Sequence, residues 1–375
     1  MDFLLESIRL VGWQHVVMWV IGALLIYLAI RKEMEPALLL PMGFGAILVN
    51  IPLSNVLTDP AAGVGEGAGI IEWLFEVGIE MSEALPILLF IGIGAMIDFE
   101  PLILNPKLMI LGAFAQIGIF LTIILATLWG FSLTDAASIG IIGAADGPTS
   151  ILVAMKLNSQ YIGPIMVVAY SYMALVPIIQ PVVIRLCTTK KERRIRMDYT
   201  SRHVSRTVKI LFPIVITLVA GLIAPKSLAL VGFLMFGNLI RECGVLGSLS
   251  ETAQTQLANL ITLLLGITIA FKMQAESFLS LQTLMILGLG LFAFVFDTVG
   301  GILCAKVINL FSKRKINPMI GAAGISAFPM SARVVHKLGL KEDNSNYLLM
   351  HAVGANVSGQ IASAIVGGLI IGLIL

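Results

Sequence analysis

The sequence predicts an all-α polytopic membrane protein made of two inverted-topology repeats, each with about five membrane spans and one broken, re-entrant helical segment. Of its 375 residues, 58% are hydrophobic and only 12% are charged, which is about half the charged fraction of an ordinary soluble protein. Apolar runs of about 18 residues or more recur along the chain, and runs of that length predict transmembrane helices. Two similar stretches rich in glycine and proline interrupt the apolar pattern, one in each half.

The two interruptions resemble each other in sequence and in position. The tetrapeptide Ile-Gly-Ala-Ala occurs at 142–145 and again at 320–323. It is followed by Asp-Gly-Pro-Thr-Ser in the first case and by Gly-Ile-Ser-Ala-Phe-Pro in the second. A pair of interrupted hydrophobic segments in corresponding positions of two halves is the best indication that a sequence gives of a transporter binding site. We therefore expect the functional residues at these two breaks.

The remaining elements divide the chain into two repeats, 1–187 and 207–375, joined by a basic linker at 188–206. In the first repeat, spans are predicted near 12–31, 36–53, 84–97, 107–130 and 161–185, with the broken segment at 135–157. In the second repeat, they are predicted near 207–224, 228–241, 258–272, 280–311 and 346–373, with the broken segment at 317–338. Segment 70–76 places apolar and acidic residues on opposite faces at helical spacing, which predicts an amphipathic helix along the membrane surface.

Basic residues gather in a few loops, and cytoplasmic loops of membrane proteins carry an excess of Lys and Arg. The linker 188–206 carries seven of them. If each broken segment enters and leaves on one side, every strongly basic loop falls in the cytoplasm and the acidic segment 54–83 falls outside. The cytoplasmic loops are then 31–35, 98–107, 188–206 and 313–315. Broken segments that crossed fully would put Arg31 and Lys32 outside, so the charges favour the re-entrant topology.

Several classes of site are not indicated. The three cysteines have no paired spacing, and none of the four histidines is paired at metal-site spacing. The sequence contains no phosphate-binding loop and no catalytic-triad signature. Asp2 and Glu6 precede a stretch of full membrane length, so we expect 12–31 to be a transmembrane helix and not a cleavable signal.

Asp146 is the first candidate for chemistry. A charged side chain at bilayer depth costs about 2.5–3.5 kcal/mol even on the most lenient insertion scale, so it needs a partner or a function. Pro148 suits the first turn of a half-helix that follows the break. The carboxylate, the free carbonyl oxygens of the break and the hydroxyls of Thr149 and Ser150 would form an oxygen cage suited to a small alkali cation. The alternative is that Asp146 only caps the half-helix.

The second break offers Asn317 at its start, Ser326 just before the half-helix that begins near Pro329, and Arg333 one turn further on. An arginine at that depth indicates a fixed anionic partner, which would be either Asp146 or a substrate carboxylate. The alternative is an arginine that extends its long side chain to the cytoplasmic interface.

Further polar groups lie inside the predicted spans. Tyr170 and Tyr172 are too deep for the interfacial belt, so at least one should bond into the polar centre, and Tyr172 could relay a proton. Alternatively, a neighbouring carbonyl satisfies each buried tyrosine. Asn356 either adds an oxygen ligand or joins helices. Asp297 and Lys272 are rival charges: Lys272 ends a span and is expected at the interface, and no helix break or repeat counterpart accompanies Asp297.

These residues together resemble a known family. The motif Gly-Ala-Ala-Asp-Gly-Pro-Thr-Ser at 143–150, Tyr172, and the stretch 317–333 that begins Asn-Pro-Met-Ile-Gly and ends Ser-Ala-Arg closely resemble the membrane β subunit of the biotin-dependent sodium-pumping decarboxylases. That family acts on oxaloacetate, methylmalonyl-CoA, glutaconyl-CoA or malonate. The resemblance covers nearly the whole chain and is weakest over 54–83.

The resemblance implies a division of labour among subunits. A soluble carboxyltransferase moves the carboxyl group of the substrate to biotin on a carrier domain. The β subunit then decarboxylates carboxybiotin, exports Na⁺ and consumes a proton. Carried over by position, Asp146 is the principal Na⁺ carboxylate, to which Asn317 and Ser326 add ligands. Tyr172 is tied to sodium and proton handling, and Arg333 to the anionic chemistry of the site.

We therefore expect Arg333, Tyr172 and Asp146 to take part in the reaction, and Arg333 and Ser326 to bind carboxybiotin. The expected Na⁺ ligands are Asp146, Asn317, Ser326, Thr149 and Asn356. The expected partners are a biotin carrier subunit, a carboxyltransferase α subunit, a small membrane-anchored γ or δ subunit, membrane lipid and further copies of the chain, but no nucleic acid. The expected location is a bacterial or archaeal cytoplasmic (inner) membrane. The competing function is a Na⁺-coupled secondary carboxylate transporter or a Na⁺/H⁺ antiporter, which inverted repeats with an intramembrane aspartate fit equally well.

Overall fold

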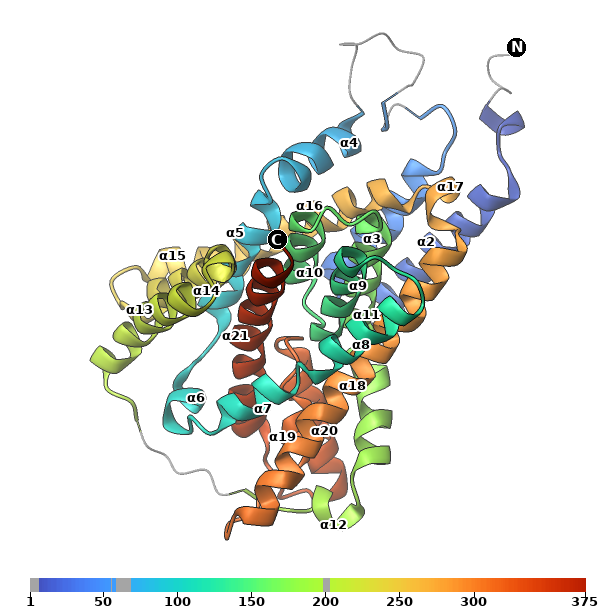
Figure 1. The fold of residues 1–375 in the computed structure, drawn as a ribbon. Coiled ribbons are helices and arrows are strands. Elements are labelled where there is room, and N and C mark those ends of the chain that lie inside the picture. Colours follow the sequence, from blue (N-terminus) through green and yellow to red (C-terminus); the bar gives the residue numbers. More distant parts are fainter. Residues whose placement is uncertain (1–6, 55, 59–68, 198–202) are drawn as a thin grey trace.

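The computed structural model describes residues 7–54, 56–58, 69–197 and 203–375, and that part of the chain folds into helices joined by short connections (Figure 1). Seven helices are long and apolar enough to cross a membrane, and one bent pair of helices meets the same test together. The protein is thus an all-α polytopic membrane protein, as the composition predicts.

The first half consists of α2 (Trp13–Lys32), α3 (Pro36–Val49), α4 (Ile70–Phe75), the π-helix η1 (Glu76–Glu80), α5 (Ala84–Met96), α6 (Glu100–Leu104), α7 (Leu108–Phe114), α8 (Ile117–Leu128), α9 (Leu133–Gly140), the 3₁₀-helix η2 (Ile141–Ala144), α10 (Gly147–Lys156) and α11 (Ile162–Cys187). A short helix, α12 (Lys190–Arg193), lies in the basic linker. The first half therefore contains a helix at each predicted span, although α3 has only 14 residues and α5 only 13, fewer than the about 20 that cross a bilayer. The break predicted at 143–150 separates η2 from α10.

The second half consists of α13 (Arg206–Ile223), η3 (Pro225–Ser227), α14 (Leu228–Glu242), α15 (Gly247–Thr252), η4 (Ala253–Leu257), α16 (Ala258–Ile269), η5 (Ala270–Met273), α17 (Ala275–Phe278), α18 (Leu281–Phe311), α19 (Met319–Ala322), α20 (Met330–Glu342) and α21 (Leu349–Ile374). The break predicted at 321–329 separates α19 from α20. The order of long helices and broken segments repeats that of the first half.

Two first-half elements add detail that the sequence only partly predicts. The amphipathic helix is present as α4 and η1, with Ile71, Phe75 and Ile79 buried on one face. It is bent by 66° from α5. The predicted span 107–130 is interrupted by a turn at Ala115 and Gln116 between α7 and α8, whereas its counterpart α18 is continuous. No proline marks this turn, so the sequence did not predict it.

Equivalent helices of the two halves make equivalent packing contacts. α2 packs on α3 as α13 packs on α14, and α3 packs on α16 as α14 packs on α5. In the same way α7 packs on α21 and α18 on α11, while α10 packs on α11 and α20 on α21. The contacts between halves also pair, α10 with α21 and α20 with α11. This pattern is what two structurally equivalent repeats related by a pseudo-two-fold axis would produce.

Backbone contact between the halves is closest where α5 crosses α14. A Cβ atom on Gly94 would overlap the carbonyl oxygen of Leu234, and one on Gly237 would overlap that of Ile91. Small residues at crossings let transmembrane helices approach closely, and this close packing stabilises them where water is absent. The two glycines therefore fix how the repeats dock.

The first broken segment begins and ends at the same end of the molecule. Asp135, at the start of α9, accepts hydrogen bonds from the Ser159 hydroxyl at 2.7 Å and the Gln160 N–H at 3.0 Å. Ser159 and Gln160 follow α10. The segment from α9 to α10 is thus a hairpin closed at its base by a buried carboxylate, which supports a re-entrant path.

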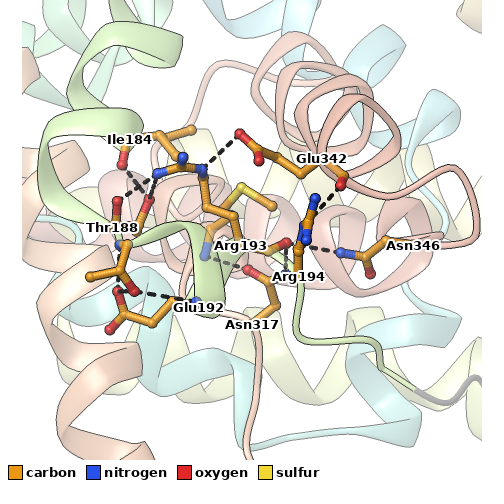
Figure 2. A network of polar contacts seen from close by, with 10 residues as sticks. Ile184, Thr188, Glu192, Arg193, Arg194, Asn317, Glu342 and Asn346 are labelled. Carbon is orange, nitrogen blue, oxygen red and sulfur yellow. Dashed lines mark hydrogen bonds and ion pairs between the residues drawn. The ribbon is translucent and has the colours of Figure 1, made fainter.

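The second broken segment closes in the same way on the basic linker (Figure 2). The amides of Asn317, before α19, and Asn346, after α20, both donate to the carbonyl oxygen of Arg193, each at 3.0 Å. The Arg193 guanidinium forms an ion pair with Glu342, the last residue of α20, at 2.9 Å. Both ends of this hairpin therefore lie beside α12.

The bases of the two hairpins lie at opposite ends of α11. This helix begins just after Gln160 and ends just before the linker, and its 26 residues correspond to about 39 Å. Figure 1 shows α9 and α10 in the upper part of the molecule and α12 at its lower end. The hairpins thus enter from opposite sides, which supports the inverted arrangement of the repeats.

The loops that the charge rule assigns to the cytoplasm are gathered at the α12 end. Glu100 in α6 accepts hydrogen bonds from Lys209 at 2.6 Å and from the Val204 N–H, and these bonds lower the pKa of Glu100. Lys306 near the end of α18 pairs with Glu192 at 3.2 Å. At the far end, Glu72 of the acidic segment bonds the Thr58 N–H, although residues 55 and 59–68 of that segment lie outside the described residues.

The α5–α14 crossing gives a direct test of the packing. Gly94→Ala should lower the free energy of unfolding by about 1–3 kcal/mol, because the added methyl group forces the two backbones apart. Gly288→Ala on α18, where a Cβ atom meets nothing within 4 Å, is the matched control and should be neutral. Thermal unfolding of the purified protein in detergent measures both, and equal midpoints would contradict the crossing.

Candidate functional site

The two breaks meet in the middle of the molecule. The backbone N–H of Ser326 in the second break donates to the carbonyl oxygen of Ala144 at the end of η2, at 2.9 Å. Ala145 then adopts a left-handed conformation with φ of 53°, which turns the chain so that Asp146 starts α10. One hydrogen bond between main chains thus joins the tips of two hairpins that come from opposite sides.

Asp146 lies at this meeting point and is only 3% exposed. Its Oδ2 atom accepts a hydrogen bond from the Thr149 hydroxyl at 2.6 Å and a longer one from the Ser363 hydroxyl at 3.4 Å. Pro148 occupies the first turn of α10, as the sequence predicts. Asp146 occupies the N-cap position of α10, and its carboxylate accepts the hydroxyl of Thr149 in that helix.

One face of α21 contacts both breaks. Asn356, Gln360 and Ser363 are spaced by four and three residues, so they share a helix face. The Asn356 amide donates to the carbonyl oxygens of Ala323 and Ile325, at 3.1 and 2.6 Å. The Gln360 amide donates to the Ser326 carbonyl oxygen. Ser363 reaches Asp146, so the last helix connects the second break to the first.

Because these amide groups turn their N–H₂ toward carbonyls, they turn their oxygens away from them. Asn356 Oδ1 and Gln360 Oε1 are buried and have no hydrogen-bond partner among the residues that the structure describes. The same holds for Gln180 Oε1 on α11, whose amide donates to the Ala322 carbonyl and the Ser331 hydroxyl. A buried oxygen without a donor is costly. Three such oxygens belong to residues that bond the second break, and each can accept from a donor or a cation.

A cavity of about 190 Å³ opens beside Asp146. Ser326 and Gln360 line it, together with Tyr170 and Glu35. Oxygen atoms of carboxylate, hydroxyl and amide groups are the ligands that hard cations prefer. No group of three or more His, Cys, Asp or Glu side chains suited to a metal ion occurs among the described residues, so the donor set favours an alkali cation over a transition metal.

The structure brings together only part of the predicted site. Asp146, Thr149 and Ser326 meet at the breaks, and Asn356 bonds the second break. Asn317 does not join them, because its amide donates to the linker carbonyls of Arg193 and Ile195 and its oxygen accepts the Met319 N–H. The prediction that Asn317 lies with Asp146 is therefore not met: the residue secures the base of the hairpin and not its tip.

The two tyrosines exchange the roles that the sequence suggested. The Tyr172 hydroxyl donates to the Leu287 carbonyl oxygen on α18, which is the satisfied buried tyrosine left open as the alternative. Tyr170 lines the cavity, and its ring occupies the place that a Cβ atom on Gly147 would need. The Tyr170 hydroxyl is buried without a partner. Residues two positions apart on a helix lie on different faces, and the sequence alone does not show which face points toward the cavity.

Arg333 lies outside the cavity, and it does not contact Asp146. It lines a second pocket of about 450 Å³, which we call the vestibule. The basic residues of the vestibule are Lys32, Arg185, Arg333, Lys337 and Lys341. Arg333 is exposed and forms no ion pair within 4.0 Å with any residue that the structure describes. A pocket of this charge suits a carboxylate or another anion.

Asp297 and Lys272, the other charged residues within predicted spans, lie in different surroundings. Asp297 on α18 is fully buried and accepts the Ile119 N–H at 3.2 Å through Oδ1. That bond holds the start of α8, which explains the turn after α7. Its Oδ2 atom lies 2.5 Å from where a Cβ atom on Gly143 would be. Lys272 lies over the rings of Phe75 and Phe271 at the opposite end from the linker.

Comparison with known proteins decides the family. A model of the family described as the Na⁺-transporting oxaloacetate decarboxylase beta subunit matches residues 14–374. The chain belongs to this family.

Relatives from several organisms cover almost the whole chain of this β subunit. It is 47% identical over 378 residues to the methylmalonyl-CoA decarboxylase subunit beta of Propionigenium modestum, covering 96% of this chain and 94% of the relative. It is 47% identical to the glutaconyl-CoA decarboxylase subunit beta of Acidaminococcus fermentans, with 96% and 94% covered. It is 43% identical to the oxaloacetate decarboxylase beta chain of Klebsiella pneumoniae, with 97% and 96% covered. The protein is thus the β subunit of a multisubunit Na⁺-transporting decarboxylase, and it is not a secondary carrier.

Several residues of the β-subunit site were missed from the sequence. Gln360 and Ser363 continue the helix face that begins at Asn356, and their spacing was the available signal. Gln180 stands between Pro177 and Pro181, and a polar side chain within an apolar span was the available signal. Glu35 had no signal, because it lies in a short loop that reaches the cavity only through the fold.

The tyrosines give a test of this site. Tyr172→Phe should lower the free energy of unfolding by about 1 kcal/mol, because it leaves the Leu287 carbonyl without its donor. Tyr170→Phe removes a hydroxyl without a partner, so it should not destabilise the protein but should change the Na⁺ concentration that protects it from heat. Thermal unfolding with Na⁺ or K⁺ measures both effects. If Tyr172→Phe instead changed the protecting Na⁺ concentration and Tyr170→Phe lowered the stability, Tyr172 would be the tyrosine that belongs to the site.

Proposed function

We propose that this β subunit decarboxylates carboxybiotin presented by a partner carrier subunit and couples the reaction to Na⁺ export and proton uptake. The observation that carries the proposal is the oxygen-rich cavity at the meeting of the two breaks. There the buried carboxylate of Asp146 lines the same cavity as Ser326 and as Gln360, whose buried amide oxygen has no hydrogen-bond partner among the described residues. The proposed Na⁺ ligands are drawn from Asp146, Ser326 and Gln360, with Thr149 and Asn356 supporting them.

The site lies where the tips of the two hairpins meet. Each hairpin reaches it from one side, and only one hydrogen bond between main chains joins their tips. A small relative movement of the two tips would open the cavity toward one side and close it toward the other. Such an element, with discontinuous helices from two inverted repeats, is the usual basis of alternating access.

The vestibule supplies the anion chemistry in this proposal. Arg333, Lys337 and Lys341 recur at every fourth residue, so they form one basic row along α20. Carboxybiotin is an N-carboxylate, and the Arg333 guanidinium can hold its carboxylate by paired hydrogen bonds. When the C–N bond breaks, CO₂ leaves and the electron pair stays on the ureido nitrogen, which takes up a proton. The reaction thus removes one anion from a basic pocket beside the Na⁺ cavity.

For energetic reasons, decarboxylation and Na⁺ export must depend on each other. Moving one positive charge outward against 100 mV costs about 2.3 kcal/mol. If CO₂ were lost with the cavity empty, that reaction would do no transport work. Decarboxylation must therefore await Na⁺ binding, and Na⁺ release to the outside must follow loss of the carboxylate.

The proposed partners and cellular location follow from the same activity. The partners are a biotin carrier subunit, a carboxyltransferase α subunit and a small membrane-anchored γ or δ subunit. The relatives act on three different acids, so their similarity does not select one. We place the protein in the cytoplasmic (inner) membrane of a bacterium or archaeon, with the linker and the vestibule in the cytoplasm, and we infer that the chain forms homo-oligomers.

Asp146→Asn tests the sodium site. The variant should lose the heat protection that Na⁺ gives over K⁺ and should lose turnover, because an amide cannot neutralise the cation. Asp135→Asn is the matched control: it removes another buried carboxylate, so it should lower stability but keep the Na⁺ half-protection concentration. Na⁺-dependent unfolding of the purified complex measures both. Full Na⁺ protection in Asp146→Asn would exclude this carboxylate from the site.

Arg333→Ala tests the anion site. The variant should insert into the membrane and still be protected from heat by Na⁺ more than by K⁺, but its rate of carboxybiotin decarboxylation should fall by at least about 100-fold, since an arginine–carboxylate contact contributes several kcal/mol. Arg194→Ala, in the linker and outside the vestibule, is the control and should stay active. Normal CO₂ release from Arg333→Ala would rule out its role in binding the carboxylate.

A further inference from the structure

The connection between α2 and α3 separates the two pockets. Glu33 and Met34 line the vestibule with Arg333, whereas the next residue, Glu35, lines the cavity with Asp146. On the opposite wall, Pro329 lines the cavity and the following residue lines the vestibule. The pockets therefore adjoin, and Glu35 and Asp146 are the two acidic residues among those that line the cavity.

The backbone at Glu35 is bonded to the first turn of α3. Glu33 and Glu35 adopt left-handed conformations, with φ of 52° and 38°, which are strained for residues with a side chain. The Glu35 carbonyl oxygen accepts the N–H groups of Leu38 and Leu39, at 3.0 and 2.9 Å. Met34 between the two glutamates is 4% exposed and anchors the loop.

Two opposing influences act on the charge of Glu35. Burial raises the pKa of its carboxyl above the ordinary value, and the positive charge of Arg333 acts in the opposite direction. Arg333 therefore stabilises the ionised form of Glu35 across the boundary between the pockets. Arg333 has no ion pair among the described residues. A substrate anion that bound Arg333 would cancel the effect of its positive charge on Glu35.

We propose that Glu35 is the element that couples the two pockets, because it exchanges its carboxylate between Arg333 on the vestibule side and Na⁺ on the cavity side. This inference rests on the proposed function and adds a residue and a mechanism to it. A carboxylate bound at Arg333 neutralises the guanidinium, so Glu35 is free to face the cavity and to bind Na⁺ as it enters. Loss of CO₂ exposes Arg333 again, which draws Glu35 back and weakens the Na⁺ site.

This exchange links the two sites in both directions, as any binding linkage must. An anion in the vestibule strengthens Na⁺ binding, and Na⁺ in the cavity strengthens anion binding. The order required by the energetics then follows, because the Na⁺ site is strongest while the carboxylate is present and weakens when it is lost. Glu35 would bind the transported Na⁺ directly and would not touch the breaking C–N bond.

A double-mutant cycle tests the inference on the purified complex. The measured quantity is the Na⁺ concentration that gives half of the thermal protection, with choline holding ionic strength constant and K⁺ as the comparison cation. Arg333→Gln should lower this concentration by at least about fivefold, the low end of typical coupling between sites, because it frees Glu35 permanently. Glu35→Gln should raise it. In the Glu35→Gln background, Arg333→Gln should have no further effect.

Glu33→Gln provides the matched control, because Glu33 is two residues away in the same loop but lines only the vestibule. With Glu33→Gln, the effect of Arg333→Gln should persist. If Arg333→Gln shifts the Na⁺ concentration equally with and without Glu35, Arg333 acts directly on Asp146 and the exchange is overturned. If Glu33→Gln also abolishes the effect, general surface charge is responsible, which overturns it too.

The failure of this inference is distinguishable from failure of the proposed function. If the unmodified protein shows no protection by Na⁺ over K⁺, the sodium site itself is absent. If it shows protection but the cycle is additive, the sodium site stands and only the coupling role of Glu35 is lost.

Discussion

The fold depends on how two interrupted helices satisfy their backbone polar groups away from water. In the bilayer core, an unpaired N–H or C=O group costs several kcal/mol, so irregular backbone is tolerated only where protein groups or a polar cavity satisfy it. The hydrogen bond between Ser326 N–H and the Ala144 oxygen joins the two interruptions. The amides of Asn356, Gln360 and Gln180 satisfy carbonyls of the second break. Without these contacts neither hairpin tip could remain at membrane depth.

The same contacts create the site. An amide that gives its N–H₂ to a break carbonyl must present its oxygen to another group, and those oxygens are buried without donors. Asp146 adds a negative charge to this set. Structural satisfaction of the breaks and affinity for a cation therefore arise from the same side chains. A substitution of Gln360 or Asn356 would thus change both the stability of the breaks and cation binding.

Charge is divided between two adjoining pockets and not concentrated in one centre. The acidic cavity lies at the hairpin tips, and the basic vestibule lies along α20 on the linker side. Hydrogen bonds and ion pairs to Arg193 hold the base of the second hairpin to the linker (Figure 2). Under the proposed function, this arrangement would place a substrate anion and a transported cation in adjoining pockets.

The sequence by itself determined the helical membrane class, most of the spans and the two breaks, and it singled out Asp146 as a candidate. These follow from local properties: apolar run length, glycine and proline at fixed positions, and the cost of a charge in an apolar span. Only the tertiary structure decided that Tyr170 and not Tyr172 faces the cavity, that Asn317 binds the linker, and that Arg333 stands apart from Asp146. Those outcomes depend on the direction in which each helix face points and on which distant segments meet. Glu35 is the clearest case, because a loop residue acquires its role only from the pockets that folding places on either side of it.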